Sequence, residues 1–305
     1  MKAWHDHKGP IVDTKNGFDV IDCVTCGFKH LIPLPSSQDL DKIYRNEYYS
    51  REKPLYLERH REDLDWWDLV YAERYAVFEK ELESSRRRIL DVGSGPGFFL
   101  KHGKERGWET FGIEPSLQAV AHSTALGLDV MHEFLTPETA KALGLFDVIY
   151  LNQVLEHIPD PAGLLQLIKQ MLTPGGLICL VVPNDYSPFQ LALTNACGFE
   201  PWWVAAPHHI NYFDFESLNR LVVKTGFEIL MTDTTFPIDM FLLMGENYIL
   251  DDANGRRCHG MRKNFEFNLE KAGLAELKQK LYRAMAKLGI GREVVTYARS
   301  VEMCE

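Results

Sequence analysis

The stretch "ILDVGSGPGFF" at residues 89–99 decides the fold of this chain. Its first residues are typical of a buried strand that ends in Asp91, and three glycines then follow at alternate positions, namely Gly93, Gly95 and Gly97. Glycines at this spacing let the backbone turn tightly and approach a ligand with no Cβ in the way. The stretch therefore predicts a buried strand, a loop that holds a ligand, and a helix after the loop. A tight turn that binds nothing is the alternative.

The spacing of the glycines distinguishes between two kinds of cofactor. In the dinucleotide-binding pattern G-x-G-x-x-G, the third glycine stands three positions after the second. Here Gly97 stands two positions after Gly95, and Pro96 lies between them. The spacing argues against NAD, although an NAD-dependent oxidoreductase remains an alternative function.

An acidic residue follows at the end of the next predicted strand. Glu114 closes "TFGIE" at 110–114, one strand after the glycine loop. A carboxylate only accepts hydrogen bonds, so it can bind both hydroxyls of a ribose at once. We expect Glu114 to hold the ribose of a nucleoside cofactor. A solvated carboxylate at a strand end is the alternative.

Predicted strands and helices alternate from residue 88 onward. Strand patterns occur at 88–94, 109–115, 129–133, 146–154, 177–184, 228–233 and 292–300. This alternation predicts an α/β fold with a doubly wound, mostly parallel sheet that is covered on both faces. Residues 237–291 interrupt the rhythm, and we interpret them as an insertion before the last strand, with a helix at 269–288.

The chain before residue 88 has a different composition. Residues 1–37 are turn-rich with one strand pattern at 18–23, and we interpret them as a small separate module. Residues 38–87 mix many aromatic residues with charges, and their apolar positions recur at helical spacing, which predicts a helical cover. The main domain then spans 88–305.

Further site candidates follow the third and fourth predicted strands. Phe134 can stack on a base, and Glu133 can accept a hydrogen bond from the amino group of the base or be solvated. Asn152 and Gln153 end the fourth strand and enter the same pocket, because ligands of such sheets bind beyond the carboxyl ends of the strands. We expect His157 to have a positioning role at the start of a helix.

Composition and charge exclude several classes of protein. Hydrophobic residues make up 46% of the chain and charged residues 25%, which is typical of a globular protein. The net charge of −10 argues against nucleic acid as the main partner. No apolar run approaches the roughly 20 residues of a membrane span, and the first residues do not resemble a signal peptide. We expect a cytoplasmic protein with a small-molecule acceptor and no membrane partner, and a homo-oligomer is compatible with these features.

Four stretches in this order resemble the motifs of class I S-adenosylmethionine-dependent methyltransferases: "ILDVGSGPGFF", "FGIEPS", "FDVIYLNQVLEHIPDP" and "LTPGGLICLVVPN". The resemblance covers about residues 88–235 and implies a seven-stranded sheet with an antiparallel last strand. It implies that the glycine loop holds the methionine part of S-adenosylmethionine and that Glu114 holds the ribose. The cofactor-binding residues implied in this way are Asp91, Gly93, Gly95, Gly97, Phe98, Glu114, Pro115, Glu133, Phe134, Asn152, Gln153 and His157.

A weaker resemblance concerns the N-terminal residues. The stretch "DVIDCVTCGFKHLIPLPSSQDLDKIYRNEYYS" is similar to the front of sugar-type methyltransferases, including C-methyltransferases, that begin with a small zinc-binding module. Those proteins typically have two C-x-x-C pairs. This chain has Cys23 and Cys26, and His5 and His7 stand where the other pair is expected. Two thiolates and two imidazoles can bind zinc tetrahedrally. A metal-free remnant of the module is the alternative.

Catalytic candidates lie in "PWWVAAPHHINYFDF" at 201–215, after the fifth predicted strand. Histidine titrates near neutral pH, so His208 or His209 can take a proton from an acceptor. Trp202 and Trp203 beside them can help exclude water from the site; packing of the aromatic residues in the core is the alternative. A histidine that only positions the following helix is the alternative, and Tyr186 or Glu156 is then the next candidate for the base.

These features predict an S-adenosylmethionine-dependent methyltransferase. Its acceptor is predicted to be a small polar metabolite, a sugar or a sugar-nucleotide or polysaccharide precursor, methylated by in-line transfer with a histidine base. The two alternatives to this function are an NAD-dependent oxidoreductase and a cofactor-binding subunit without catalysis.

Overall fold

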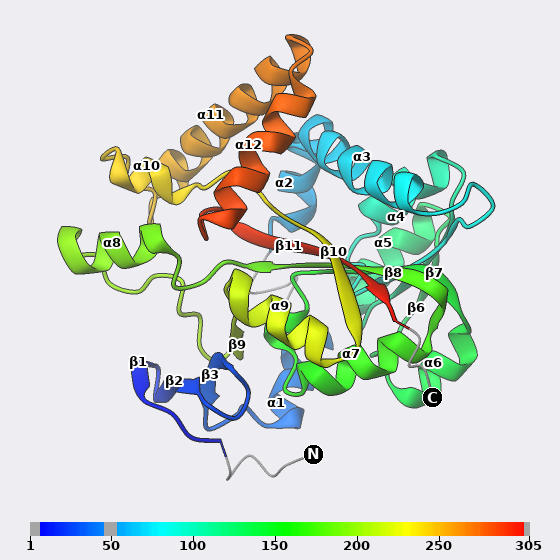
Figure 1. Cartoon of the computed structure of the whole chain (residues 1–305), viewed down its shortest axis with the longest axis horizontal. Helices are drawn as coiled ribbons and strands as arrows, with labels where there is room; N and C mark the ends of the chain where they lie inside the picture. The colour runs from blue at the N-terminus through cyan, green and yellow to red at the C-terminus, as the bar shows by residue number, and fades with distance from the viewer. Residues whose placement is uncertain (1–6, 46–53, 302–305) are drawn as a thin grey trace.

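A computed structural model describes residues 7–45 and 54–301 of the 305 residues. Within these residues the strands form a seven-stranded and a four-stranded sheet. Figure 1 shows the larger sheet crossing the middle of the molecule, with the smaller one beside it near the N-terminus.

The larger sheet has the predicted doubly wound topology. Its strand order is β10-β11-β8-β7-β4-β5-β6. All neighbours from β8 to β6 run parallel, whereas β11 is antiparallel to both β8 and β10. This order confirms the mostly parallel seven-stranded sheet with an antiparallel last strand. The bounds are β4 (Arg88–Val92), β5 (Glu109–Ile113), β6 (Asp129–Met131), β7 (Phe146–Asn152), β8 (Leu172–Pro183), β10 (Phe227–Thr234) and β11 (Glu293–Ser300).

Helices cover both faces of this sheet, as Figure 1 shows. One face is covered by α3 (Leu64–Glu81), α4 (Phe98–Glu105) and α5 (Leu117–Ala125), and the other by α6 (Pro137–Leu143), α7 (Pro161–Gln170) and α9 (Phe215–Lys224). Because both faces are buried, the central strands are almost continuously apolar, as parallel strands require. The aromatic side chains of α3 form one core cluster with β7, β8 and β11, while α7 and α9 contribute to the other.

The smaller sheet joins two distant parts of the chain. It contains β1 (Ile11–Lys15), β2 (Phe18–Cys23), β3 (Phe28–Ile32) and the two-residue strand β9 (Asn211–Tyr212), all antiparallel. Asn16 and Gly17 connect β1 to β2 with φ angles of 54° and 80°, the geometry of a tight hairpin turn. The sequence pattern did not predict β9, because two residues are too few for a strand signal.

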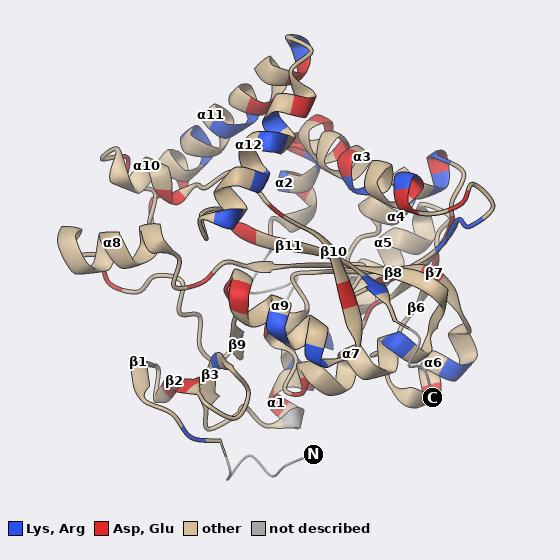
Figure 2. Cartoon of the chain, viewed as in Figure 1, with Lys and Arg blue, Asp and Glu red and all other residues tan. Residues whose placement is uncertain are grey.

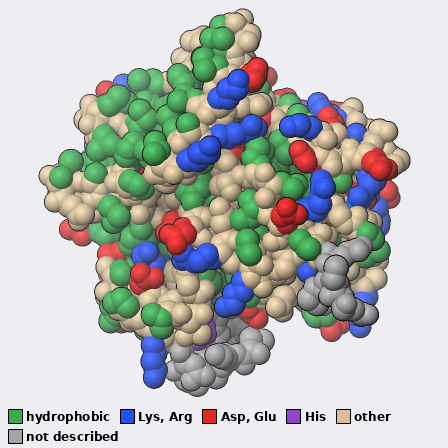
Figure 3. All heavy atoms as spheres, viewed as in Figure 1, with side chains coloured by type: hydrophobic (Ala, Val, Ile, Leu, Met, Phe, Trp, Pro, Cys, Tyr) green, Lys and Arg blue, Asp and Glu red, His purple; other side chains and the backbone are tan. Residues whose placement is uncertain are grey.

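The insertion before the last strand is helical. It contains α10 (Asp239–Leu243), α11 (Asp252–Lys271) and α12 (Ala275–Lys287). The predicted single helix at 269–288 is wrong, because Gly273 takes a φ of 71° and separates α11 from α12. Figure 2 shows Lys and Arg along α11 and α12, and Figure 3 shows hydrophobic side chains gathered over α10 and α11.

Short helices complete the described chain. They are α1 (Ser37–Lys42), α2 (Tyr56–Glu62), the 3₁₀ helix η3 (Leu155–His157) and α8 (Pro188–Cys197). Helix α7 ends at Gln170, because Leu172 already pairs with Phe146 in the sheet. Among the helices of the described residues, none combines the length and the apolar character that a membrane crossing needs.

Candidate functional site

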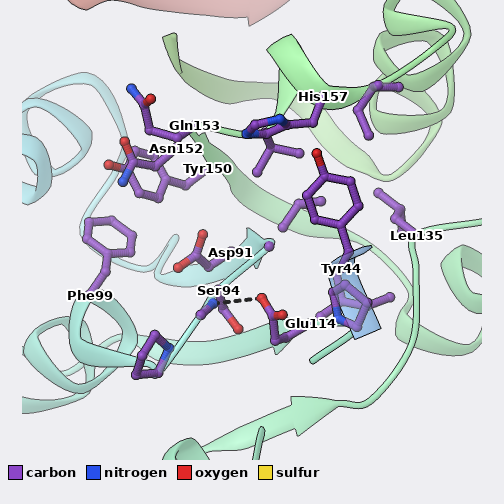
Figure 4. Close-up of a pocket in the computed structure, with 18 of the residues that line it drawn as sticks. Tyr44, Asp91, Ser94, Phe99, Glu114, Leu135, Tyr150, Asn152, Gln153 and His157 are labelled. Carbon is purple, nitrogen blue, oxygen red and sulfur yellow. Dashed lines mark hydrogen bonds between the residues drawn. The ribbon is translucent and has the colours of Figure 1, made fainter. Parts of the chain in front are cut away.

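A cavity of about 500 Å³ opens at the carboxyl ends of the parallel strands. The loops after β4, β5, β6 and β7 form its floor, and aromatic residues of the helical cover form its roof. Figure 4 shows Asp91 and Glu114 close together and His157 across the cavity from them. We call these two sides the cofactor end and the acceptor end.

The glycine loop forms part of the wall at the cofactor end. Gly93 has a φ of 71°, and a Cβ at this position would lie 2.7 Å from Val154 Cγ2. The next glycine, Gly95, has a φ of 53°, and its amide donates a 2.9 Å hydrogen bond to Glu114 Oε2. Both glycines and Phe98 line the cavity. The loop therefore brings bare backbone to a ligand, as the glycine pattern predicted.

Gly97 has a different role from the other two glycines. It precedes α4 with a φ of 84° and is not among the residues that line the cavity. An added Cβ would lie 2.6 Å from Leu128 Cδ1 and 2.7 Å from Ser123 Oγ. This glycine allows the loop to pack closely against α5 and the residues after it, and its contact with the cofactor stays a prediction.

Two buried carboxyl groups face the cofactor end. Glu114 accepts hydrogen bonds from the amides of Gly95 and Ser116, at 2.9 and 2.8 Å. Burial raises the pKa of Glu114 to about 7, against the effect of these two bonds. Burial and the neighbouring Glu114 raise the pKa of Asp91 well above its usual range. A carboxylate has about four acceptor sites, so Glu114 retains capacity for the two hydroxyls of a ribose.

The remaining predicted cofactor residues also line the cavity; they are Pro115, Glu133, Phe134, Asn152, Gln153 and His157. At the mouth, Arg45 forms an ion pair with Glu133 at 3.1 Å and lies over the ring of Phe134 at 4.8 Å. The bare glycine backbone, the buried acceptor Glu114 and the adjoining aromatic edge fit S-adenosylmethionine.

The helical cover contributes residues that the sequence patterns did not single out. Tyr56, His60, Trp67 and Tyr71 all line the cavity. The ring of His60 stacks between Trp67 and Phe98, with centroid distances of 5.0 and 4.1 Å. Burial lowers the pKa of His60 to about 4, so this side chain is neutral near pH 7. The unusual density of aromatic residues at 38–83 was the available signal, but it predicted only a cover.

The acceptor end is built around three histidines. His157, His208 and His209 all line the cavity, and we call them the acceptor histidines. His157 Nδ1 donates to the carbonyl oxygen of His208 at 2.8 Å. Its Nε2 lies 3.7 Å from Oε1 of the fully buried Glu156, and the ring of His209 packs edge-on against His157 at 5.0 Å.

The aromatic residues near these histidines are not among the residues that line the cavity, and they pack in the core instead, which was the alternative expectation. Trp203 and Tyr212 are buried in a separate cluster with β2 and β3, and Trp202 packs against that cluster. Tyr186 is likewise absent from the lining and donates a 2.6 Å hydrogen bond to Asp13. Its hydroxyl is therefore bound to the small sheet rather than directed at the acceptor.

A second group of polar residues gathers at the turn between β2 and β3. The ligand atoms of His7, Cys23, Cys26 and His30 all lie within 4.8 Å of one another, and we call these residues the metal cluster. Three of them were predicted, whereas His30 was not. The fourth predicted ligand, His5, lies outside the described residues. His30 was missed because a single histidine within a strand gives no sequence signal for metal binding.

The donor set of the metal cluster fits zinc. His7 Nδ1 lies 3.2 Å from Cys26 Sγ and 3.7 Å from Cys23 Sγ, and 3.1 Å from His30 Nε2. Ligand atoms around a tetrahedral zinc lie roughly 3.3–3.8 Å apart, given bond lengths of about 2.0–2.3 Å. His30 Nδ1 donates to the carbonyl of Leu31 at 2.9 Å, a bond that directs Nε2 toward the cluster. Burial and the neighbouring Cys23 raise the pKa of the Cys26 thiol to about 12.

Comparison with known proteins gives one family. The model of a methyltransferase domain family matches residues 58–232, more than half of the chain. Curated relatives include the ubiquinone biosynthesis O-methyltransferase of Cereibacter sphaeroides, 27% identical over 53% of this chain and 70% of the relative. The enzyme of the same name from Xanthomonas axonopodis is 29% identical over 51% of this chain and 74% of its own length.

Solved structures share the fold. A methyltransferase from Archaeoglobus fulgidus superimposes with a TM-score of 0.50 at 18% identity, covering 76% of this chain and 94% of that protein. The plantazolicin methyltransferase in complex with SAH also gives 0.50, at 12% identity, over 86% of this chain and 94% of its own.

Proposed function

This chain belongs to the class I S-adenosylmethionine-dependent methyltransferases, and we propose that it methylates a hydroxyl oxygen of a small polar acceptor with the help of a histidine base. The observation that carries this proposal is the position of the acceptor histidines: all three line the cavity, and His157 lies across it from Asp91 and Glu114 (Figure 4). A hydroxyl is a weak nucleophile, and its proton must leave during the transfer, so a base near neutral pKa assists the reaction.

When bound, S-adenosylmethionine would supply an electrophilic methyl group on a sulfonium, which the acceptor oxygen would take in line as the C–S bond breaks. Gly93, Gly95 and Glu114 would hold the methionine part and the ribose. The acceptor proton would pass to an imidazole nitrogen of His209 or His208. Orienting the two reactants and excluding water are the other contributions of the cavity to the rate.

The buried carboxylate of Glu156 supports a role in proton transfer for its neighbours. It lies within 4.8 Å of the ligand nitrogens of both His157 and His209. A fully buried carboxylate is costly unless a positive charge is close. A proton received by His209 would therefore be stabilised by Glu156, which favours His209 over His208 as the base.

We expect His209→Asn to lower turnover by about 10²–10⁴-fold, because this is the usual contribution of a general base. The affinity for S-adenosylhomocysteine and the melting temperature should stay near the wild-type values. His208→Asn is the matched control at the neighbouring position. If both variants turn over at wild-type rates, the proposal of a histidine base at this loop is wrong.

The acceptor class can be tested directly with methyl-labelled S-adenosylmethionine. We propose a sugar or sugar-nucleotide acceptor, in line with the resemblance of the N-terminal residues to sugar-type methyltransferases. The relatives named for ubiquinone biosynthesis make a precursor of that pathway the second candidate. Incubation with panels of sugar nucleotides and of such precursors, followed by product mass measurement, distinguishes the two. Labelling only in the second panel would overturn the sugar proposal.

We also propose that the metal cluster holds one zinc ion with a structural role. Four protein ligands complete a tetrahedral site and leave no open position, which is typical of structural zinc. Metal analysis of the purified protein should find about one equivalent of zinc. Cys23→Ser should lower this content and loosen the small sheet, because metal binding and folding are coupled in such modules. Cys197→Ser, at an exposed cysteine outside the cluster, is the control. A metal-free wild-type protein would contradict the proposal.

A further inference from the structure

The small sheet and the acceptor end share a strand. β9 pairs with β3 so that Asn211 stands opposite His30, a member of the metal cluster, and Tyr212 stands opposite Lys29. The amide of Leu31 also donates to the carbonyl of Ile210 at 2.9 Å. The backbone directly after His209 is therefore hydrogen-bonded to the strand that carries a metal-cluster histidine.

The segment before β9 is attached to the same sheet. We call residues 201–210 the acceptor loop, because it contains two of the acceptor histidines. Its residues Trp203, Val204 and Ala206 pack with Val20 of β2 and Leu31 of β3 in one buried cluster. The carbonyl of Ala206 also accepts a 2.9 Å hydrogen bond from Asn16, in the turn between β1 and β2. Both ends of the acceptor loop are thus held by the small sheet.

Asn211 connects the small sheet to η3, the segment that carries the third acceptor histidine, His157. Its side chain is fully buried, and its Nδ2 donates to the carbonyls of Leu155 and Ile158, at 3.0 and 2.8 Å. These two carbonyls flank Glu156 and His157 in η3. Both hydrogens of the amide are used in this way, so a residue without this amide group cannot replace them.

Two further hydrogen bonds join the acceptor loop to η3. The amide of Ile210 donates to the carbonyl of Glu156 at 2.8 Å, and His157 Nδ1 donates to the carbonyl of His208 at the same distance. The contacts described at the cofactor end, by contrast, are made within and between the loops of the large sheet. The small sheet therefore makes direct hydrogen bonds to the acceptor loop and to η3, whereas the hydrogen bonds of Glu114 at the cofactor end involve only loops of the large sheet.

From these contacts we infer that the metal-loaded small sheet positions the acceptor histidines, with Asn211 as the positioning residue between the metal cluster and η3. This inference rests on the proposed function, which assigns the binding of the acceptor to this end of the cavity. Loss of the metal loosens β3, and the looser β3 no longer fixes β9, the acceptor loop and His157. The site then still binds the cofactor but loses the arrangement of its histidines.

Hydrogen exchange of the full-length protein, before and after removal of zinc with a chelator, tests this inference without knowledge of the acceptor. We expect at least tenfold faster exchange in residues 154–158 and 205–213 after removal. Exchange in residues 91–97 and 112–116 should be unchanged, and the affinity for S-adenosylhomocysteine should change less than twofold. Unchanged exchange at 154–158 and 205–213, or equal loosening of all four segments, would overturn the inference.

A variant separates the positioning role from general stability. Asn211→Ala should increase exchange at 154–158 at least tenfold while zinc stays bound and the cofactor affinity is kept. The matched control is Asn219→Ala, which removes side-chain hydrogen bonds to Thr232 and Thr296 on the large sheet and should not affect η3. If Asn211→Ala does not fold, chelation of the wild-type protein decides alone. A protein that binds no zinc overturns the inference but not the histidine base, which the turnover of His209→Asn tests separately.

Discussion

At the cofactor end of the cavity, the side chains come from loops that directly follow strands of one sheet, whereas at the acceptor end they come from segments that a second sheet holds together. Gly93 and Glu114 are placed by β4 and β5, which are neighbours in both sequence and space. His157 and His209 are 52 positions apart, and hydrogen bonds from Asn211 and Ile210 join their segments. The cofactor end is thus formed by neighbouring strands and their loops, whereas the acceptor end depends on contacts between residues far apart in the chain.

The largest effect that should separate the two ends comes from Glu114→Ala. The variant loses an acceptor for two hydrogen bonds to a charged group, each contributing about 1.5–3 kcal/mol at most. We expect at least tenfold weaker binding of S-adenosylhomocysteine in calorimetry, with the acceptor histidines unaffected. Glu109→Ala, at the opposite and exposed end of β5, is the control and should bind normally. Equal affinity in both variants would remove Glu114 from the cofactor end.

The pH dependence of cofactor binding should show a smaller effect that again belongs to one end only. Burial raises the pKa of Glu114 to about 7. Ribose hydroxyls donate to the carboxylate, so binding favours the deprotonated form, and affinity should rise with pH through about 7 and level off above it. Between pH 8 and pH 6 we expect about a tenfold loss of affinity, since roughly one carboxylate in ten remains ionised at pH 6. Glu114→Gln should remove most of this dependence; a profile identical to that of the wild type would assign the titration to another group.

The smallest effect on cofactor binding is expected for Gly97→Ala, which would define the limit of the cofactor end within the glycine loop. Gly97→Ala adds a methyl group against Leu128 and Ser123 at a φ of 84°, so we expect a loss of about 1–3 kcal/mol in the free energy of unfolding. Gly107→Ala has a similar φ of 85° but open space around it, and therefore reports the backbone strain alone. Urea denaturation measures both. A stability loss in Gly97→Ala no larger than that in Gly107→Ala would contradict a packing role for Gly97.

The difference between the two ends explains what could be predicted. The glycine spacing, the acidic residue one strand later and the strand–helix alternation are short-range patterns, and they predicted the sheet and a cofactor end whose residues line the cavity. His208 and His209 were also placed at the cavity. The sequence left two positions open for the aromatic residues beside them, because Trp203 and Tyr212 could equally pack on another element, and that element, the small sheet, has no pattern linking it to residue 203.

The sequence alone determined the class of the fold. Apolar strands that alternate with amphipathic helices bury their apolar surfaces in a parallel sheet that is covered by helices on both faces. The sequence also determined where the cofactor binds, because parallel strands end at the same edge and carry their loops with them. Only the tertiary structure decided that His30 joins His7, Cys23 and Cys26, that Gly97 faces α5 and that Asn211 connects the small sheet to η3. Each of these contacts joins residues whose positions no sequence pattern relates. The contacts therefore depend on how complete elements pack against one another.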